Sequence, residues 1–196
     1  MVHPIEVESY RILAERVDLS AWPEPERAIV ARVIHATADL DYAHTMRIGQ
    51  NAVAAAIAAL QAGAPVVCDA HMLRVGITKA NALCLLDEVP EAPPNSTRSA
   101  EAFRRAATRY PEGAIWAVGN APTALETLLH LHEDGHVAPA AVVGLPVGFV
   151  GAAESKQSLW SSDLRPLAIT NTGEKAGTPT AAATINALTR LSDPSN

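Results

Sequence analysis

The stretch AAVVGLPVGFVGAAESK, residues 140–156, joins an apolar run to a glycine-rich loop that ends in charged residues. Residues 140–143 are small or β-branched and show no polar alternation, which is typical of a strand buried on both faces of a parallel sheet. Gly144, Gly148 and Gly151 then let the backbone approach a ligand closely or take a positive φ. Ligands of open α/β sheets bind beyond the carboxyl ends of the strands, so this loop is expected to form one wall of a site.

Short apolar runs separated by helix-length segments predict a three-layer, Rossmann-like α/β fold with a mainly parallel sheet of about five strands. The runs span residues 65–68, 82–86, 114–118, 140–143 and 166–170. Helices are expected ahead of the sheet over residues 4–16, 23–38 and 51–61. Later helices are expected over residues 71–75, 99–109, 122–134, 152–161 and 177–191, with a frayed tail at 193–196.

The composition favours one compact acidic domain. The 196 residues are 48% apolar, which allows one substantial core, and we expect a single domain over residues 1–196. The net charge of −6 argues against a nucleic-acid partner, because phosphate binding needs a clustered basic face. The longest apolar run, residues 52–60, is far below the roughly 20 residues of a membrane span. Residues 1–15 carry scattered glutamates and no apolar core of the signal-peptide kind, so a cytoplasmic location is expected.

The cysteines and histidines predict no metal site. Cys68 and Cys84 are isolated, without a CxxC partner, and are expected to be small core residues. Among His130, His132 and His136, only the last two are four residues apart and therefore neighbours on a helix. No cysteine and no clear carboxylate completes a ligand set with them, so solvated residues at a helix end are the favoured interpretation.

Chemically suggestive residues follow two further strands. Asp69 comes directly after the run at 65–68, and the segment GNAPT, residues 119–123, comes after the run at 114–118. Both are expected on the same rim of the sheet as the loop that begins at Gly144. Neither glycine-bearing strand end matches a P-loop, and GxGxxG is absent. The sequence therefore lacks the motifs that would best indicate nucleotide binding.

His35 is the candidate for proton transfer. It lies near the end of the second predicted helix, three residues after Arg32, and the two side chains share one helix face. A neighbouring guanidinium makes an imidazole lose its proton more readily, which suits a proton shuttle. The alternative is a histidine that only interacts with the last carbonyls of its helix. The pattern leaves both open.

Two other segments allow a structural and a functional interpretation. Thr97 and Ser99 could each cap the helix expected at 99–109, whereas Arg98 beside the helix-start amides could receive a carboxylate or phosphate. Glu154 and Lys156 are two residues apart and so point to different faces of a helix. Each of them could either be solvated or belong to the site.

These residues resemble the precorrin-8X methylmutases of cobalamin biosynthesis, including the cobalt-precorrin-8 enzymes of the anaerobic route. The resemblance runs over nearly the whole chain, and GNAPTAL followed by PVGFVGAAESK is its most specific part. It is carried by ESY at 8–10, RVIH at 32–35, GAPVVCD at 63–69, GIT at 76–78, TRSA at 97–100, GNAPTAL at 119–125 and residues 144–156.

The resemblance implies an isomerase that moves a methyl group from C11 to C12 of precorrin-8X or cobalt-precorrin-8, giving hydrogenobyrinate or cobyrinate. No separate cofactor is implied, and cobalt enters only within the substrate. The residue matching His35 is the catalytic acid or base of the family, and those matching Ser9 and Arg32 contact the substrate. The migration is allowed by orbital symmetry, so protonation and positioning are the main requirements.

The substrate implied by the resemblance carries many acetate and propionate groups, which need local receptors even on an acidic protein. The residues expected to bind it, besides Ser9 and Arg32, are Thr97, Arg98, Ser99, Gly119, Asn120, Gly148 and Gly151. Family resemblance also implies a homodimer with the site at or near the subunit interface. Two alternatives stay open: a non-catalytic tetrapyrrole-binding paralogue or carrier, and a Rossmann-like enzyme that binds a phosphate.

Overall fold

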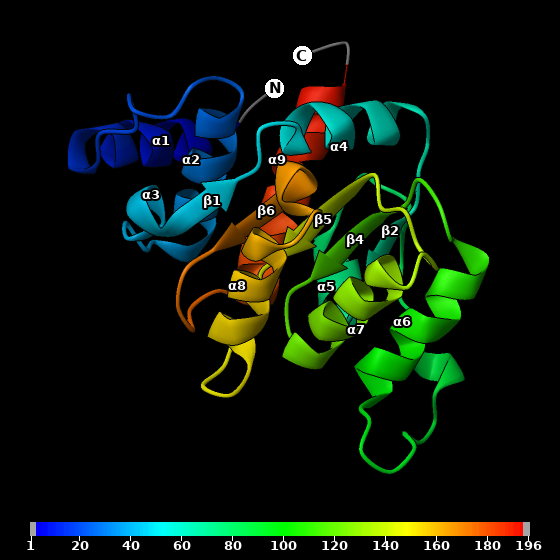
Figure 1. The fold of residues 1–196 in the computed structure, drawn as a ribbon. Coiled ribbons are helices and arrows are strands. Elements are labelled where there is room, and N and C mark those ends of the chain that lie inside the picture. The colour runs from blue at the N-terminus through cyan, green and yellow to red at the C-terminus, as the bar shows by residue number, and fades with distance from the viewer. Residues whose placement is uncertain (1–2, 194–196) are drawn as a thin grey trace.

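A computed structural model describes residues 3–193, in which six strands form one sheet in the order β1-β6-β5-β4-β2-β3 (Figure 1). All neighbouring strands are parallel except β1, which pairs antiparallel with β6. The mainly parallel α/β sheet predicted from the apolar runs is therefore confirmed. The strands are β1 Met46–Ile48, β2 Val66–Cys68, β3 Ala82–Leu83, β4 Ile115–Val118, β5 Ala141–Gly144 and β6 Ala168–Asn171.

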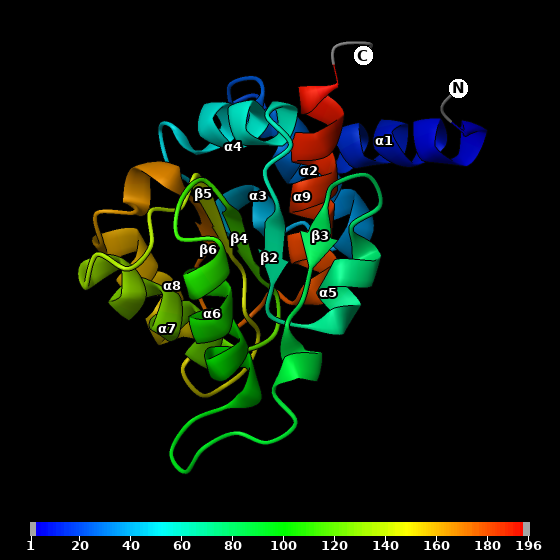
Figure 2. The same ribbon diagram turned by 90° about the vertical axis from the view of Figure 1, so that its right-hand side faces the viewer.

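Helices cover both faces of the sheet (Figures 1 and 2). One face carries α6 (Arg98–Arg109), α7 (Pro122–Glu133) and α8 (Ala152–Ser161). The other face carries α4 (Ala52–Gln61), α5 (His71–Gly76) and α9 (Thr178–Ser192). Outside α9 lie α2 (Glu26–Thr37) and, against it, α1 (Pro4–Arg16). Short elements complete the fold: α3 (Tyr42–Thr45), η1 (Leu86–Glu88) and η2 (Arg165–Leu167).

Most strand residues are apolar because the central strands β2, β4, β5 and β6 contribute to two cores. Along β4, Ile115 and Ala117 lie in the core beneath α9, whereas Trp116 and Val118 lie in the core beneath α6 and α7. This alternation is the period of two that a strand imposes on its side chains. Trp116 packs its ring edge against Phe103 of α6, with centroids 4.9 Å apart. Both layers of helices are thus held by the same four-residue strand.

The sequence patterns missed or misplaced several elements. The strand β1, reading MRI, and the single-turn helix α3 were not predicted, since both are too short to show a period. The strand predicted over 82–86 ends at Leu83, and the one predicted over 166–170 begins at Ala168, where a 3₁₀ turn containing Pro166 ends. Of the tail predicted to fray, residues 194–196 lie outside the described range.

The topology places a switch point between β2 and β4. The chain leaves β2 into α5 on one face of the sheet and leaves β4 into α7 on the other. Such a crevice is where open α/β folds bind their ligands. None of the helices within residues 3–193 is long and apolar enough to cross a membrane.

Candidate active site

The switch-point crevice is filled by a carboxylate of the chain itself. Asp69, directly after β2, is fully buried. Its Oδ1 accepts a hydrogen bond from the amide of Gly119 at 3.0 Å, and its Oδ2 accepts from the amides of Asn120 at 2.9 Å and Ala121 at 2.6 Å. These amides precede Pro122, the first residue of α7. The donors that a phosphate would need at this helix start are therefore already engaged.

Burial and close packing both act on this strand end. Burial raises the pKa of the Asp69 carboxyl, and the amide donors act in the opposite direction because they stabilise the carboxylate. A Cβ at Gly119 would lie 3.0 Å from the Cα of Thr178, so the start of α9 approaches the backbone closely there. The alternative of a phosphate-binding enzyme finds no support in this crevice.

Thr97 and Ser99 have structural partners. Thr97 caps α6 by accepting the amide of Ala100 at 3.2 Å, and its hydroxyl lies 2.7 Å from that of Thr123. The hydroxyl of Ser99 donates to the carbonyl of Asp69 at 3.2 Å. The capping interpretation of Thr97 is confirmed, whereas substrate contacts of Thr97 and Ser99 stay predictions.

Arg98 also bonds within the chain. Its Nε donates to the carbonyl of Val89 at 2.6 Å and its Nη2 donates to the carbonyl of Leu86 at 2.9 Å. These bonds hold the segment around η1 against the start of α6. Binding of a substrate carboxylate by Arg98 stays a prediction. Such a carboxylate would have to bond N–H groups of Arg98 other than those that donate to Val89 and Leu86.

The loop after β5 is apolar and open. Phe149 and Val150 are 95% and 88% exposed. Gly148, with φ of 139°, donates its amide to the carbonyl of Glu174 at 3.2 Å, and Gly151, with φ of 79°, precedes α8. Both glycines therefore adopt backbone conformations that other residues avoid. The loop does lie at the carboxyl end of β5, but its role as a wall of the site stays a prediction.

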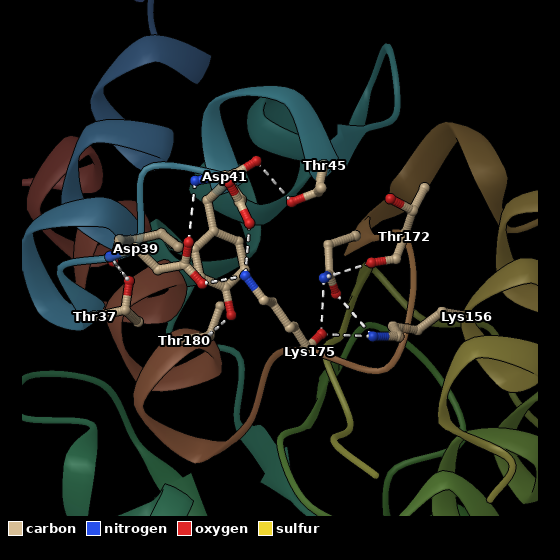
Figure 3. Close-up of polar contacts among 11 residues, drawn as sticks. Thr37, Asp39, Asp41, Thr45, Lys156, Thr172, Lys175 and Thr180 are labelled. Atoms are coloured by element: carbon tan, nitrogen blue, oxygen red, sulfur yellow. Dashed lines mark hydrogen bonds and ion pairs between the residues drawn. The ribbon is translucent and has the colours of Figure 1, made fainter. Parts of the chain in front are cut away.

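The charged end of this loop divides into an exposed and a buried residue. Glu154 is exposed, as solvation requires. Lys156 is only 1% exposed, so a solvated role is wrong for this residue. Its ammonium donates to Oδ1 of Asn171 at 3.0 Å and to the carbonyl of Lys175 at 2.8 Å (Figure 3). Burial lowers the pKa of Lys156 to about 8, against a smaller opposite effect of Glu174.

Lys175 ties the segment after β6 to the end of α2 (Figure 3). Its ammonium lies 2.9 Å from Oδ2 of Asp39 and 2.7 Å from Oδ2 of Asp41. The Lys175 ammonium lowers the pKa of Asp39. Close by, the hydroxyls of Tyr42 and Thr180 are 3.2 Å apart. The helix that carries His35 is thereby fixed at its carboxyl end to the loops of the sheet.

His35 is held by two consecutive residues of α1. Its Nδ1 forms a hydrogen bond of 2.8 Å with the hydroxyl of Ser9, and the ring of Tyr10 stacks on the imidazole with centroids 4.8 Å apart. The imidazole therefore lies against α1 rather than on the last carbonyls of α2. The structure brings together Ser9 and His35, which the sequence singled out, although 26 residues separate them.

Arg32, one helical turn before His35, takes part in a charge cluster. Its Nη1 lies 3.2 Å from Oε1 of Glu6 in α1. The same carboxylate oxygen lies 3.7 Å from Nη1 of Arg190 in α9. Arg32 thus meets an acidic residue of the chain and a second arginine that the sequence analysis did not consider.

A cavity of about 890 Å³ opens beside this cluster, between α1, α2, α9 and the segment that follows α5. Its wall includes Glu6, Tyr10, Arg32, Lys79, Asn186 and Arg190. His35 lies just outside this wall and touches it through the ring of Tyr10. The sequence held a signal for part of this cavity wall, because Glu6 and Tyr10 are four residues apart and so share one face of α1. Nothing in the sequence pointed to Lys79 or Arg190.

The residues of the carboxyl rim lie elsewhere. None of Thr97, Arg98, Ser99 and the glycines of the loops contributes to the wall of this cavity. Of the predicted substrate contacts, the structure places Ser9 and Arg32 around His35 and its cavity. The remaining candidates follow β4 and β5 or lie at the start of α6, and their contacts with a substrate stay predictions.

The histidines considered for a metal lie apart from this cavity. The Nδ1 of His132 is 3.0 Å from the carbonyl of Val137, which orients its ring on the backbone. Within residues 3–193, no three His, Cys, Asp or Glu side chains are grouped so that they could hold a metal ion.

Fold and site define an α/β protein that buries a carboxylate at its switch point and carries a histidine beside a cavity on the helical face. Comparison with known proteins makes the assignment specific. The sequence profile of the CbiC family, precorrin-8X methylmutase, matches residues 4–191. A precorrin-8X methylmutase of Sinorhizobium sp. is 39% identical, with 93% of this chain and 91% of the relative covered.

Two further relatives agree. A cobalt-precorrin-8 methylmutase of Priestia megaterium is 36% identical, with 96% of this chain and 88% of the relative covered. The crystal structure of the precorrin-8X methylmutase from Thermus thermophilus matches with a TM-score of 0.86 and 35% identity, over 96% of this chain and 95% of that one. The chain belongs to the precorrin-8X methylmutase family, whose members are isomerases of corrin biosynthesis.

Proposed function

We propose that this protein moves a methyl group from C11 to C12 of precorrin-8X or cobalt-precorrin-8, giving hydrogenobyrinate or cobyrinate. Family membership supports the reaction, and the names of the relatives support the two substrates. The observation that carries the proposal is the hydrogen-bonded and stacked His35, next to a cavity of about 890 Å³ with Arg32 in its wall.

His35 is the proposed acid and base. Ser9 engages Nδ1, so Nε2 is the nitrogen that exchanges a proton with the macrocycle. Protonation changes which arrangement of double bonds is favoured, and the methyl group then migrates between adjacent ring carbons. The same imidazole takes a proton back as the new conjugation forms, so substrate and product remain isomers. Such proton transfer contributes roughly 10²- to 10⁴-fold to a rate.

No separate cofactor takes part in this proposal, and cobalt, where present, arrives within the substrate. We also propose a homodimer, with the exposed Phe149 and Val150 as apolar side chains for a second copy to cover. Sedimentation velocity tests this: a dimer is expected, and Phe149→Ser should shift it toward monomer. The cytoplasmic location expected from the sequence stays a prediction that cell fractionation tests.

The reaction is tested by incubating the protein with precorrin-8X and, separately, with cobalt-precorrin-8 while recording visible spectra. Appearance of the hydrogenobyrinate or cobyrinate chromophore supports catalysis. A bound but unchanging spectrum with both macrocycles would instead establish the carrier. The ratio of the two rates assigns the natural substrate.

A further inference from the structure

The cavity contains an ion pair that belongs to the protein itself. Glu6 lies in the first turn of α1, and one of its carboxylate oxygens is 3.2 Å from Arg32 and 3.7 Å from Arg190. Two guanidinium groups from different helices, α2 and α9, therefore converge on a single carboxylate at the wall of the cavity. Guanidinium groups bind carboxylates through charge-assisted hydrogen bonds, so this pair of arginines suits a carboxylate of a ligand as well.

Without Glu6, the cations of the cavity wall outnumber its acidic side chains still further. Arg32, Lys79 and Arg190 are the lysine and arginine side chains of the wall, and Glu6 and Asp193 are its acidic side chains. If Glu6 swings away, the converging guanidinium groups lose this carboxylate and an anion from solution becomes favourable in its place. The chain as a whole is acidic, at −6, so this basic wall is a local feature.

We propose that Glu6 is an internal substitute for a carboxylate of the ligand, which displaces it from Arg32 and Arg190 on binding. Lys79 and Arg190 thereby become carboxylate-binding residues, in addition to Arg32. The inference rests on the proposed function, because the ligand is taken to be a macrocycle with acetate and propionate groups.

The first turn of α1 is built to release Glu6 at little cost. Its apolar neighbours Ile5 and Val7 are both exposed, and Leu13, near the other end, is the buried residue of this helix. Moving the first turn therefore uncovers little apolar surface. Partly exposed ion pairs are weak, so a ligand with several carboxylates competes effectively with the single one of Glu6.

Displacement also bears on His35. Ser9 and Tyr10, which hold the imidazole, lie one turn after Glu6 on the same helix. A carboxylate that replaces Glu6 leaves the rest of α1 in place, so His35 keeps its orientation beside a cavity whose cation pair is then occupied.

The test is the affinity for hydrogenobyrinate, measured by titration of its visible absorption, for matched variants of the whole protein. Glu6→Gln keeps the shape and removes the competing charge, so binding should become about three- to tenfold tighter. Arg190→Met should weaken binding about tenfold. In the double variant the gain from Glu6→Gln should shrink, because one of the two guanidinium groups that pair with Glu6 is gone.

Glu8→Gln is the control, since Glu8 lies on the same helix and pairs with the exposed Arg11. Its affinity should equal that of the wild type, and melting temperatures verify that each variant folds. Unchanged or weaker binding by Glu6→Gln would overturn the inference while leaving the function intact, provided the wild type turns over precorrin-8X. A wild type that binds no corrin would overturn both.

Discussion

The switch-point crevice and the helical face use charge in opposite ways. In the crevice the carboxylate of Asp69 is buried and matched by three backbone amides, so the bonding there is complete. On the helical face Arg32 and Arg190 share one partly exposed carboxylate beside an open cavity. The contrast teaches that the two regions use a carboxylate differently: backbone amides bond that of Asp69 inside the protein, whereas guanidinium side chains pair with that of Glu6 at the wall of a cavity.

A chain of contacts joins α8 and the sheet to the end of α2. Lys156 and Lys175 connect the ends of α8 and β6, and Lys175 reaches the aspartates that follow α2 (Figure 3). The position of His35 therefore depends on contacts between the end of α2 and the segment that follows β6. Variants in each region separate the two roles.

The largest effect is expected for His35→Ala. Turnover should fall by about 10³-fold, or about 4 kcal/mol in activation free energy, because no other group supplies the proton. Affinity for hydrogenobyrinate should stay within about threefold, since the carboxylates of the ligand bind elsewhere. Initial rates and absorption titrations measure both. His44→Ala, at an exposed position of α3, is the control, and normal turnover by His35→Ala would refute the proton-transfer role.

Asp69→Asn is expected to act on stability instead. The new amide group would point a donor at backbone donors, so about 3 kcal/mol of unfolding free energy should be lost. Urea denaturation measures this. Asp87→Asn, at an exposed aspartate that pairs with His71, should cost at most about 0.5 kcal/mol. Similar costs for the two variants would mean that the crevice is not held by Asp69.

Lys156→Met should lose more stability at alkaline pH than at neutral pH. The pKa of Lys156 is lowered to about 8, so above this value the unfolded chain binds more protons than the folded one. The contribution of Lys156 to wild-type stability therefore rises with pH up to the ordinary lysine pKa of about 10.4. Relative to Lys156→Met, the wild type should gain about 2 kcal/mol between about pH 7 and pH 10. Denaturation across this range measures the difference, and a constant difference would contradict it.

The smallest effect is expected for Ser9→Ala. Removing the hydroxyl frees Nδ1 of His35 but leaves the stacked Tyr10 in place. Turnover should fall about tenfold, which corresponds to about 1.4 kcal/mol of activation free energy. KM should stay nearly unchanged, because the variant loses the orientation of the base and keeps the contacts with the ligand. Ser9→Thr should restore part of the rate. A rise in KM at constant kcat would instead make Ser9 a binding residue.

Apolar runs predicted the strands because a strand covered on both faces shows no polar alternation. They failed at β1, where MRI is too short and contains a charge, and at Leu86, where a 3₁₀ turn follows the strand. The position of Lys156 on α8 followed from the sequence. Its burial did not, because it depends on how α8 packs against β6, which the local period of α8 does not reveal.

The sequence by itself determined the α/β class, most helix boundaries and the placement of Arg32 and His35 one turn apart on the same helix, because these depend on spacing along a few turns. The resemblance carried by GNAPTAL and PVGFVGAAESK named the family that the comparisons then established. Only the tertiary structure decided that Asp69 closes the crevice and that Glu6, Lys79 and Arg190 face one cavity. These contacts join segments that are far apart in the sequence, such as Glu6 and Arg190, and no local period in the sequence reveals them.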